Sequence, residues 1–281
     1  MKGRTIVLDH VAGREAAALL VDGQLDDLLI DGTDMPRPGA IYRGICDRPI
    51  KGQGGMMLRL PEGETAFLRH GKGLRPGQPL LIQVTGYAEG GKAIPVTDRV
   101  LFKSRYAIVT PRKPGVNVSR QITDDARDAL LAIAHETFDA DHGLILRSSC
   151  SGADADDIAD DIAAMASLAD AILAESDGTE PIALTEGDGP HLLAWREWTA
   201  KADVVTTAGG FADLGVLDQL EAIARPHVPL AEGNMYVEPT RALVAVDVNT
   251  GSDTAPAAAL KANLAAARAL PLALRLRGLG G

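Results

Sequence analysis

The spacing of apolar residues predicts β-structure in the first part of the chain. Residues 17–31 gather apolar side chains on both sides of Asp22-Gly23, which is the pattern of a β-hairpin. Residues 31–39 are rich in Pro, Gly and Asp and predict a linker. From residue 41 to residue 110, short β-like runs alternate with glycine and other turn residues, as is typical of a small β-barrel.

The apolar pattern changes to helical spacing in the segment of residues 116–138. Residues 116–138 predict a helix with Thr123 as a good N-cap and acidic residues in the first turn, where the helix dipole favours anions. Residues 143–149 predict a strand with an abrupt polar end. Residues 154–175 predict an amphipathic helix. Its apolar face is formed by Ile158, Ile162, Met165, Ala169 and Ile172.

That second helix begins with acidic residues that could be taken for a metal site. They are Asp154, Asp156, Asp157, Asp160 and Asp161. An acidic first turn beside a solvated face explains these residues more simply, so we assign no metal to them.

The last third of the chain mixes both patterns. Residues 175–190 predict a flexible connection, and a helical piece follows around residues 192–198. Residues 216–224 predict a helix, and residues 234–251 predict a strand, a turn and a strand. The tail, from residue 257 onward, predicts a helix that contains Pro271 and stops at glycines.

Composition narrows the class of protein. The chain has 281 residues, of which 46% are apolar and 23% charged, so it is long enough for two or three domains. It has no run of about eighteen apolar residues that would predict a membrane span, and its first ten residues lack the apolar core of a secretory signal. The two cysteines, Cys46 and Cys150, show no CxxC spacing. We therefore expect a reduced, cytoplasmic protein without a structural zinc site.

Charge is distributed unevenly along the chain. The net charge of −10 argues weakly against a nucleic-acid partner, but residues 36–120 hold 15 Lys and Arg against 5 Asp and Glu. The remainder of the chain is therefore strongly acidic. A basic block inside an acidic protein is typical of a module that faces phosphate groups, and equally of a solvated basic face. Charge alone leaves both interpretations open.

Residues 242–251, ALVAVDVNTG, end an apolar strand with Asp247 and Asn249. Because side chains alternate along a strand, these two residues should share one face while Val246 and Val248 pack on the other. A carboxylate can bind Mg²⁺ through oxygen, and a carboxamide can orient a phosphate or a water. Asp and Asn also end strands because they form turns, and the pattern alone favours that simpler explanation.

Longer motifs change that balance. Residues 240–251, TRALVAVDVNTG, followed by residues 260–281, LKANLAAARALPLALRLRGLGG, resemble the catalytic region of the bacterial RNase E/G endoribonucleases. That family typically reads TEALVAIDVN(T/S)G, then NLEAA and RQLRLRDLGG. SRQI (119–122) and GLILRS (143–148) resemble the SRRI and GLIVRT motifs of its domain that senses the RNA 5′ end. RPGAIYRGIC (37–46) resembles the entry to its OB-fold RNA-binding domain, so the resemblance covers essentially the whole chain.

The resemblance implies a multidomain fold of the α/β (α+β) class. An RNase-H-like domain would carry an inserted OB-fold β-barrel and a 5′-sensor domain, and a partial DNase-I-like catalytic domain would follow. The expected domains are residues 1–35 (first segment of the RNase-H-like domain), 36–105 (OB-fold barrel), 106–175 (5′ sensor), 176–228 (second segment of the RNase-H-like domain) and 229–281 (partial DNase-I-like catalytic domain).

The resemblance also implies roles for single residues. Asp247 would bind the catalytic Mg²⁺, and Asn249 would orient the scissile phosphate or support Asp247. Arg147 and Ser148 would hold a 5′-monophosphate together with the backbone amide near Ile108, because a guanidinium offers a planar fork of donors that matches phosphate oxygens. Further RNA contacts are expected from Arg120, Lys103, Arg105, Arg112, Lys113 and Phe67.

Three departures from the family pattern affect these expectations. The family's second metal-binding Asp follows LRLRDLGG, whereas this chain stops at Gly281, so we expect a truncated sequence whose activity on its own is uncertain. The CxxC zinc link between subunits is absent, so no zinc-bridged dimer is expected, and a homo-oligomer is left open. The family's barrel usually shows an aromatic-containing AFVDxG strand, whereas residues 52–71 here read GQGGMMLRLPEGETAFLRHG, and the aromatic residues nearby are Phe67, Tyr42 and Tyr87. RNA binding should therefore rely on charge and weaken sharply with salt.

The sequence thus predicts a Mg²⁺-dependent endoribonuclease that hydrolyses single-stranded RNA, in RNA processing (rRNA processing included) or decay, and prefers 5′-monophosphate ends. A Mg²⁺-bound water or hydroxide would attack the phosphodiester and leave a 5′-phosphate and a 3′-hydroxyl. The alternative is a non-catalytic RNA-binding protein that keeps the RNA-binding and sensor modules. A structural or protein-interaction module without RNA affinity is the third hypothesis, and no membrane partner is expected.

Overall fold

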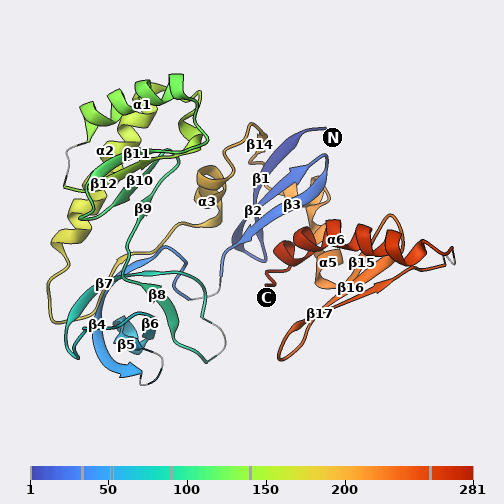
Figure 1. Cartoon of the computed structure of the whole chain (residues 1–281), viewed down its shortest axis with the longest axis horizontal. Helices are drawn as coiled ribbons and strands as arrows, with labels where there is room; N and C mark the ends of the chain where they lie inside the picture. Colours follow the sequence, from blue (N-terminus) through green and yellow to red (C-terminus); the bar gives the residue numbers. More distant parts are fainter. Residues whose placement is uncertain are drawn as a thin grey trace. The chain divides into compact units, whose positions relative to one another are not determined.

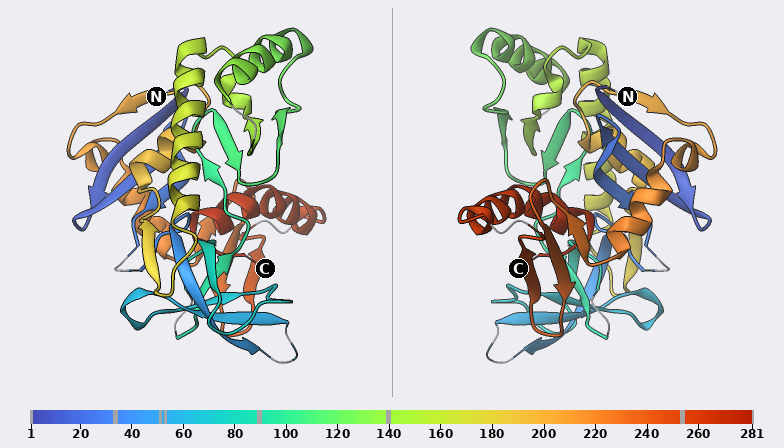
Figure 2. Two further views of the ribbon diagram at one scale, coloured as in Figure 1. Left: turned by 90° about the vertical axis from the view of Figure 1, so that its left-hand side faces the viewer. Right: turned by 90° about the vertical axis from the view of Figure 1, so that its right-hand side faces the viewer.

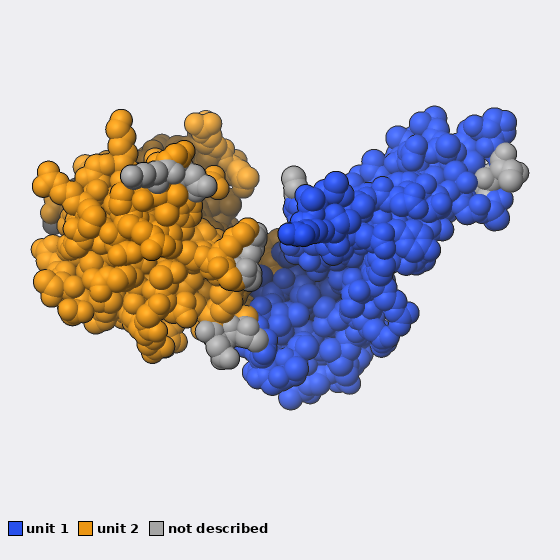
Figure 3. Space-filling model, turned by 90° about the horizontal axis from the view of Figure 1, so that it is seen from below, with its two compact units in different colours: residues 1–31, 201–281 blue, residues 32–200 orange. Residues whose placement is uncertain are grey.

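A computed structural model describes residues 2–32, 35–50, 52, 54–88, 91–138, 141–252 and 255–280. The chain forms two compact units, which Figure 3 shows in different colours. Unit 1 consists of residues 1–31 and 201–281, and unit 2 of residues 32–200. The predicted linker at 31–39 includes the first crossing between the units, and its residues 33–34 lie outside the described residues, as does Gly281.

The first sheet of unit 1 has the strand order β14-β1-β2-β3. Its strands are β1 (Arg4–Val11), β2 (Arg14–Val21), β3 (Gln24–Ile30) and β14 (Asp203–Val205). Neighbouring strands are antiparallel, except that β1 and β14 are parallel. The predicted hairpin is confirmed, because Asp22 and Gly23 connect β2 to β3 with φ of +50° and +81°, as a two-residue type I′ turn requires.

Two short helices, α4 (Gly210–Asp213) and the predicted α5 (Val216–Ala224), contribute to the core of this sheet. The buried core residues are Val7, Ala16, Ala18, Leu20, Leu25, Phe211 and Val216. The carboxylate of Asp9 accepts a hydrogen bond from the backbone N–H of Phe211 at 3.0 Å. This bond lowers the pKa of Asp9 and ties β1 to the start of α4.

The second sheet of unit 1 has the order β15-β16-β17, and α6 lies along one of its faces (Figure 2). These elements are β15 (His227–Pro229), β16 (Asn234–Pro239), β17 (Val244–Asn249) and α6 (Ala258–Leu276). The predicted strand, turn, strand and final helix are confirmed. Pro271 lies inside α6, and Gly278, with φ of +62°, follows its end. Met235 and Val237 bury their side chains against Ala266 and Ala273 of the helix.

Unit 2 contains a closed, five-stranded β-barrel of OB-like topology. Its strands are β4 (Ile41–Ile50), β5 (Gly55–Arg59), β6 (Thr65–Leu68), β7 (Pro79–Val84) and β8 (Ile94–Thr97), with a single 3-10 turn, η1 (Pro61–Gly63), between β5 and β6. The order is β4-β5-β6-β8-β7, and the pairing of β4 with β7 closes the barrel. Only β6 and β8 are parallel within it. The predicted barrel is therefore confirmed at this coarse level.

The other half of unit 2 is a sheet of order β11-β12-β10-β9 with two helices packed against it (Figure 1). Its elements are β9 (Phe102–Lys103), β10 (Ala107–Thr110), β11 (Gly115–Val118), α1 (Asp124–Thr137), β12 (Gly143–Leu146), η2 (Ser148–Cys150) and α2 (Ala155–Ala174). The predicted apolar face of α2 is confirmed, since its isoleucines and Ala169 are buried and Met165 is partly buried. Thr123 is the N-cap residue of α1, although its side chain makes no capping hydrogen bond.

Two sequence predictions about unit 2 are corrected. The last run assigned to the barrel, at residues 105–110, contains β10, which pairs with β9 and β12 in the other sheet. The flexible connection at 175–190 contains β13 (Ile182–Thr185), which pairs with β4 and then leads into the predicted helix α3 (Pro190–Glu197). The local sequence pattern could not predict the sheet to which β10 belongs or the existence of β13, because both depend on pairing with strands far along the chain. Across the described part of the chain, no helix is both long and apolar enough to cross a bilayer.

Candidate functional site

Asp247 and Asn249 lie on the face of β17 opposite α6. The Asn249 side chain donates a hydrogen bond from Nδ2 to Asp247 Oδ2 at 2.8 Å, and both residues are exposed. The prediction that they share one face is thereby confirmed. The other half of that prediction holds for Val248, which packs toward α6, but Val246 remains 39% exposed. A single helix does not cover the whole of the opposite face.

The neighbouring strands add polar groups to the same face, which we call the Asp247 face. Tyr236 is paired with Asp247 across the sheet, and His227 is paired with Tyr236, so the three form one row. The rings of His227 and Tyr236 meet edge to face with centroids 5.2 Å apart. Asn234, in the next row, is paired with Asn249, and its buried Oδ1 has no hydrogen-bond partner among the described residues.

Gly233 fixes the approach to this face. Its φ of +83° is unfavourable for residues with a side chain, and an added Cβ would collide with the backbone carbonyl of Asn249. The turn before β16 can therefore lie directly against the end of β17 only because this position is glycine.

The Asp247 face carries residue types that suit a hard cation. Asp247 offers a carboxylate, while Asn234 and Asn249 offer carboxamide oxygens, and these are ligand types that suit Mg²⁺. Within the described ranges, no group of three or more His, Cys, Asp or Glu side chains could hold a metal ion. Mg²⁺ in proteins commonly uses one or two carboxylates with waters as further ligands, so the residue types on this face are compatible with that ion.

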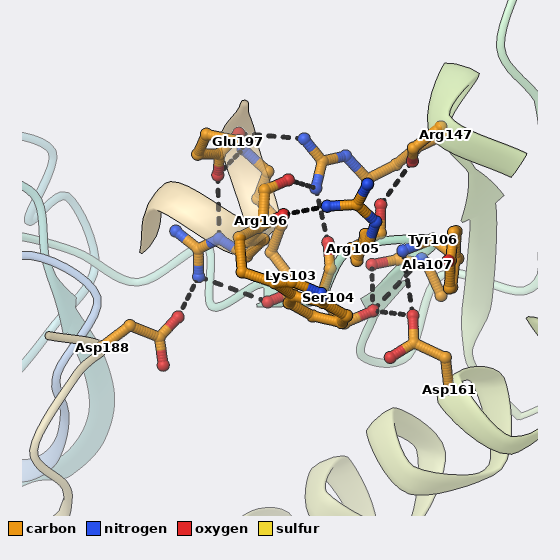
Figure 4. Close-up of polar contacts among 12 residues, drawn as sticks. Lys103, Ser104, Arg105, Tyr106, Ala107, Arg147, Asp161, Asp188, Arg196 and Glu197 are labelled. Atoms are coloured by element: carbon orange, nitrogen blue, oxygen red, sulfur yellow. Dashed lines mark hydrogen bonds and ion pairs between the residues drawn. The ribbon is translucent and has the colours of Figure 1, made fainter. Parts of the chain in front are cut away.

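A second polar site lies in unit 2, where α3 ends beside β9 and β12 (Figure 4). Its centre is the carboxylate of Glu197, which pairs with three cations, and we call these residues the Glu197 cluster. Lys103 Nζ lies 2.7 Å from Glu197 Oε1, Arg196 Nε lies 2.8 Å from the same atom, and Arg147 Nη2 lies 2.9 Å from Oε2. Arg196 also pairs with Asp188.

The three cations determine the protonation of Glu197. Burial alone would raise the pKa of this carboxyl, but the hydrogen bonds from Lys103 and Arg196 and the positive charges nearby outweigh burial, so its pKa lies below the ordinary value. Glu197 is therefore ionised at neutral pH, and its single negative charge leaves the three cations with a net positive charge.

Arg147, the predicted phosphate ligand, uses part of its guanidinium to hold the cluster together. Nη1 donates to the carbonyl oxygens of Ser104 and Arg196, and Nη2 donates to Glu197. A guanidinium has five N–H groups, so Nε–H and one N–H of Nη2 have no acceptor among the residues described. This Arg is thus oriented by protein contacts and keeps two donors for a ligand.

The other two predicted phosphate ligands differ in position. Ser148 begins η2 and is exposed, and its hydroxyl has no hydrogen-bond partner in the described part of the chain. Ile108 lies in β10, an interior strand of its sheet, and is paired with Lys103 on one side and Ile145 on the other. Its backbone N–H therefore points along the sheet toward a neighbouring strand, which is a weaker position for a phosphate donor.

Asp161 corrects the picture of a fully solvated acidic face on α2. Its carboxylate accepts a hydrogen bond from the Ser104 hydroxyl and another, at 2.9 Å, from the backbone N–H of Tyr106. The remaining acidic residues of that helix start are exposed, and Asp154 caps the helix by accepting from the N–H of Asp156. Asp161 therefore fixes the turn between β9 and β10, which contains Arg105 and directly follows Lys103.

The other residues predicted to contact RNA are scattered over unit 2. Arg105 lies beside the Glu197 cluster, while Arg112 and Lys113 line a separate cavity of about 610 Å³ near Asp177. Arg120 is exposed. Phe67 is half-buried in β6, with its ring against Gly55. Arg105 therefore lies near Arg147, whereas Arg112, Lys113 and Phe67 belong to other parts of unit 2.

Sequence reasoning missed Trp195 and Glu197, both on α3. Trp195 is 49% exposed, and the guanidinium of Arg105 lies 5.2 Å from its ring centroid. The available signal was the segment LLAWREW, in which a short helix ends with a charged pair between two tryptophans. Charged residues beside large aromatic rings need partners when they are partly buried, and here the partners come from β9 and β12.

Comparisons with known proteins place this chain in a family. The model of the Ribonuclease E/G family matches residues 102–205 and 200–281. Ribonuclease E of Nostoc sp. is 25% identical over an alignment that covers 95% of this chain and 47% of that protein. Ribonuclease G of Salmonella typhimurium is 25% identical over 74% of this chain and 50% of that protein. The chain spans about half the length of these relatives, and it belongs to the Ribonuclease E/G family.

Proposed function

We propose that this protein is a Mg²⁺-dependent endoribonuclease that hydrolyses single-stranded RNA in RNA processing and prefers 5′-monophosphate ends. Membership of the Ribonuclease E/G family supports the reaction class. The observation that supports a particular site for this reaction is the Asp247–Asn249 pair. The two side chains are exposed and hydrogen-bonded to each other on the face of β17 that α6 does not cover. On this proposal the remaining architecture corresponds to RNase-H-like, OB-fold, sensor and DNase-I-like domains in a cytoplasmic protein.

The Asp247 face would bring a phosphodiester and a cation together. Bound Mg²⁺ would supply a water of lowered pKa and neutralise charge on the phosphate in the transition state. Asp247 would hold the cation through its carboxylate, and Asn249 would keep that carboxylate in one orientation through the bond at 2.8 Å. The amide oxygen of Asn234, which has no partner in the described chain, would accept from a water or face the cation directly.

Preference for a 5′-monophosphate would come from the Glu197 cluster. The two unused donors of Arg147 and the free hydroxyl of Ser148 could bind phosphate oxygens, and charge-assisted hydrogen bonds of this kind are roughly twice as strong as neutral ones. Arg105, Arg112, Lys113 and Arg120 would contribute mainly charge along the RNA backbone, so affinity should fall as salt is added.

The direct test is cleavage of a fluorogenic single-stranded oligoribonucleotide over a range of Mg²⁺ concentrations. We expect products with 5′-phosphate and 3′-hydroxyl ends, and a loss of at least about 10²-fold in kcat for Asp247→Asn, since the charge that holds the cation is gone. Asp218→Asn, an exposed acid on α5 of the same unit, is the matched control and should cut normally. Equal activity of Asp247→Asn and the unmodified chain would contradict the proposal.

The 5′-end preference has its own test. Arg147→Ala should bring the cleavage rates of 5′-monophosphorylated and 5′-hydroxyl substrates closer together, whereas Arg120→Ala should lower both rates alike. An unchanged ratio in Arg147→Ala would remove Arg147 from this role.

One observation favours a second function, an RNA-binding protein without turnover. The described residues contain no cluster of three or more acidic or other metal-binding side chains, and Asp247 is the sole carboxylate in its row of the sheet. Salt-sensitive RNA binding with no cleavage at any Mg²⁺ concentration would support this function over the first.

A further inference from the structure

An exposed tryptophan lies beside the Glu197 cluster and has no role in the function proposed above. Trp195 is 49% exposed on α3, whereas Trp198, three residues later, is only 8% exposed. Single exposed apolar side chains are normal on a protein surface, so the exposure of Trp195 becomes informative through the groups that surround its ring. The difference between the two tryptophans indicates that Trp195 is available to a partner while Trp198 belongs to the core.

The orientation of Trp195 is fixed by residues of the turn between β9 and β10. The guanidinium of Arg105 lies 5.2 Å from the centroid of the Trp195 ring and donates a hydrogen bond to the Trp195 carbonyl. The ring of Tyr106 meets the Trp195 ring edge to face, with centroids 6.5 Å apart and planes at 77°. The Ser149 hydroxyl in turn donates to the carbonyl of Arg105. The ring is therefore held in place before any ligand arrives, which lowers the entropic cost of binding.

Arg105 differs from the three cations of the Glu197 cluster in having no ion pair within the described chain. Lys103, Arg147 and Arg196 all pair with Glu197, but Arg105 forms no ion pair with any carboxylate in the described chain. Arg105 and Arg147 donate to the carbonyls of Trp195 and Arg196, which are consecutive residues at the end of α3. An aromatic ring, an uncompensated guanidinium and the donors of Arg147 thus meet at the same end of one short helix.

These groups match the parts of a nucleotide, namely a base with a flat apolar face and phosphates with negative charge. We propose that Trp195 is a stacking platform for the base of the first nucleotide of an RNA 5′ end, with Arg105 facing a phosphate of the same strand. The proposal rests on the function proposed above, because it assumes that Arg147 and Ser148 receive the terminal phosphate. It adds a subsite that contacts the base and tolerates any base, since every base has a π-face.

Binding experiments in the absence of Mg²⁺ separate this subsite from catalysis. The probes are a 5′-monophosphorylated single-stranded oligoribonucleotide and the same molecule with an abasic first residue, each labelled at its 3′ end for anisotropy. Stacking on an aromatic ring contributes about 1–3 kcal/mol per base, so Trp195→Ala should weaken binding of the first probe by roughly tenfold, and Trp195→Phe should restore most of it. Leu192→Ala changes an equally exposed residue one turn earlier on α3 and should alter affinity by less than about twofold.

The abasic probe distinguishes stacking from a general loss of affinity. The unmodified chain should bind it about tenfold more weakly than the intact probe, while Trp195→Ala should bind both alike. In a Trp198→Phe background, where Trp195 is the remaining tryptophan, the intact probe should quench tryptophan emission and the abasic probe should not.

Three results would overturn the proposal. These are unchanged affinity in Trp195→Ala, the same penalty for the abasic probe in both proteins, or unquenched Trp195 emission at saturating RNA. If the unmodified chain cleaved RNA and preferred 5′-monophosphate ends while any of these held, only the stacking platform would fall. If the unmodified chain bound no RNA even at low salt, the proposed function would fall with it.

Discussion

The Asp247 face and the Glu197 cluster differ in how the protein surrounds a charged carboxylate. On the Asp247 face, one carboxylate lies in water with a single side-chain hydrogen bond, from Asn249. In the Glu197 cluster, one carboxylate is surrounded by three cations whose side chains are between 16% and 34% exposed. The Asp247 carboxylate has few protein partners and depends on a ligand for further contacts, whereas the Glu197 carboxylate already has its partners within the protein.

The difference teaches which properties a substitution should change at each site. An exposed carboxylate contributes little to folding, so its loss should affect chemistry alone. A carboxylate that neutralises half-buried cations contributes to folding, because its loss leaves charges without a partner. The Glu197 cluster therefore combines stability with ligand orientation, and the Asp247 face separates the two.

The largest expected effect on stability comes from Glu197→Ala. Breaking a buried ion pair from one side typically costs 3–5 kcal/mol, and because these groups are partly exposed we expect about 2 kcal/mol here. For a unit of this size that corresponds to a fall of about 4–8 °C in Tm. Asp247→Ala should change Tm by less than about 1 °C. Thermal unfolding followed by circular dichroism measures both, and equal shifts would abolish the contrast between the sites.

The pH dependence of stability follows from the sign of the Glu197 pKa shift. Because the pKa of the folded state is lowered, the stabilisation is present above the ordinary pKa of 4.5 and is lost as pH falls through the lower, folded value. The Tm difference between the unmodified chain and Glu197→Gln should therefore be full at pH 7 and shrink below about pH 4.5. A difference that grew on acidification would show that Glu197 is not stabilised in its charged form.

Sequence patterns identified the Asp247 face much more fully than the Glu197 cluster. Alternation along one strand placed Asp247 and Asn249 together, because a strand determines the faces of its own residues. The partners of Glu197 come from β9, β12 and α3, and no local period relates Lys103, Arg147 and Arg196. Asp161 could not be predicted from local sequence either. Its place at the start of an acidic helix predicted a solvent-exposed side chain, whereas Ser104 and Tyr106, in the turn before β10, donate hydrogen bonds to it. A small barrel was predictable from strand spacing and its OB type from the family resemblance, but β13 was not predictable, because its pairing with β4 joins distant segments.

Asn249→Ala tests whether Asp247 needs its hydrogen-bond partner in order to bind a metal ion. Removing a residue that orients a metal ligand typically lowers metal affinity or activity by 10–100-fold. We expect the Mg²⁺ concentration for half-maximal cleavage to rise by about tenfold, with Tm unchanged, since a single exposed hydrogen bond is lost. Mn²⁺ binding followed by electron paramagnetic resonance provides a readout that does not depend on turnover. Glu238→Gln, on the same face but paired across the sheet with Ala245 instead of Asp247, is the matched control.

Normal metal binding in Asn249→Ala would mean that Asp247 needs no support from its neighbour. The Asp247 face would then lack any organising contact from the protein, and its difference from the Glu197 cluster would be even larger.

The smallest expected effect concerns the turn that follows Arg147. Cys150 ends this turn, donates a weak hydrogen bond from Sγ to the carbonyl of Tyr106 at 3.3 Å, and has a pKa raised to about 11 by burial. At pH 8 its thiol should therefore react slowly with iodoacetamide. The thiol of Cys46 in the barrel should also react slowly, because burial raises its pKa as well.

Because Arg147 joins the turn to Glu197, we expect Glu197→Ala to speed labelling of Cys150 several-fold and to leave labelling of Cys46 unchanged. Mass spectrometry of the labelled peptides measures both rates. Asp247→Asn should alter neither rate. Equal acceleration of both cysteines would indicate global unfolding, and no acceleration would show that the turn keeps its shape without the cluster.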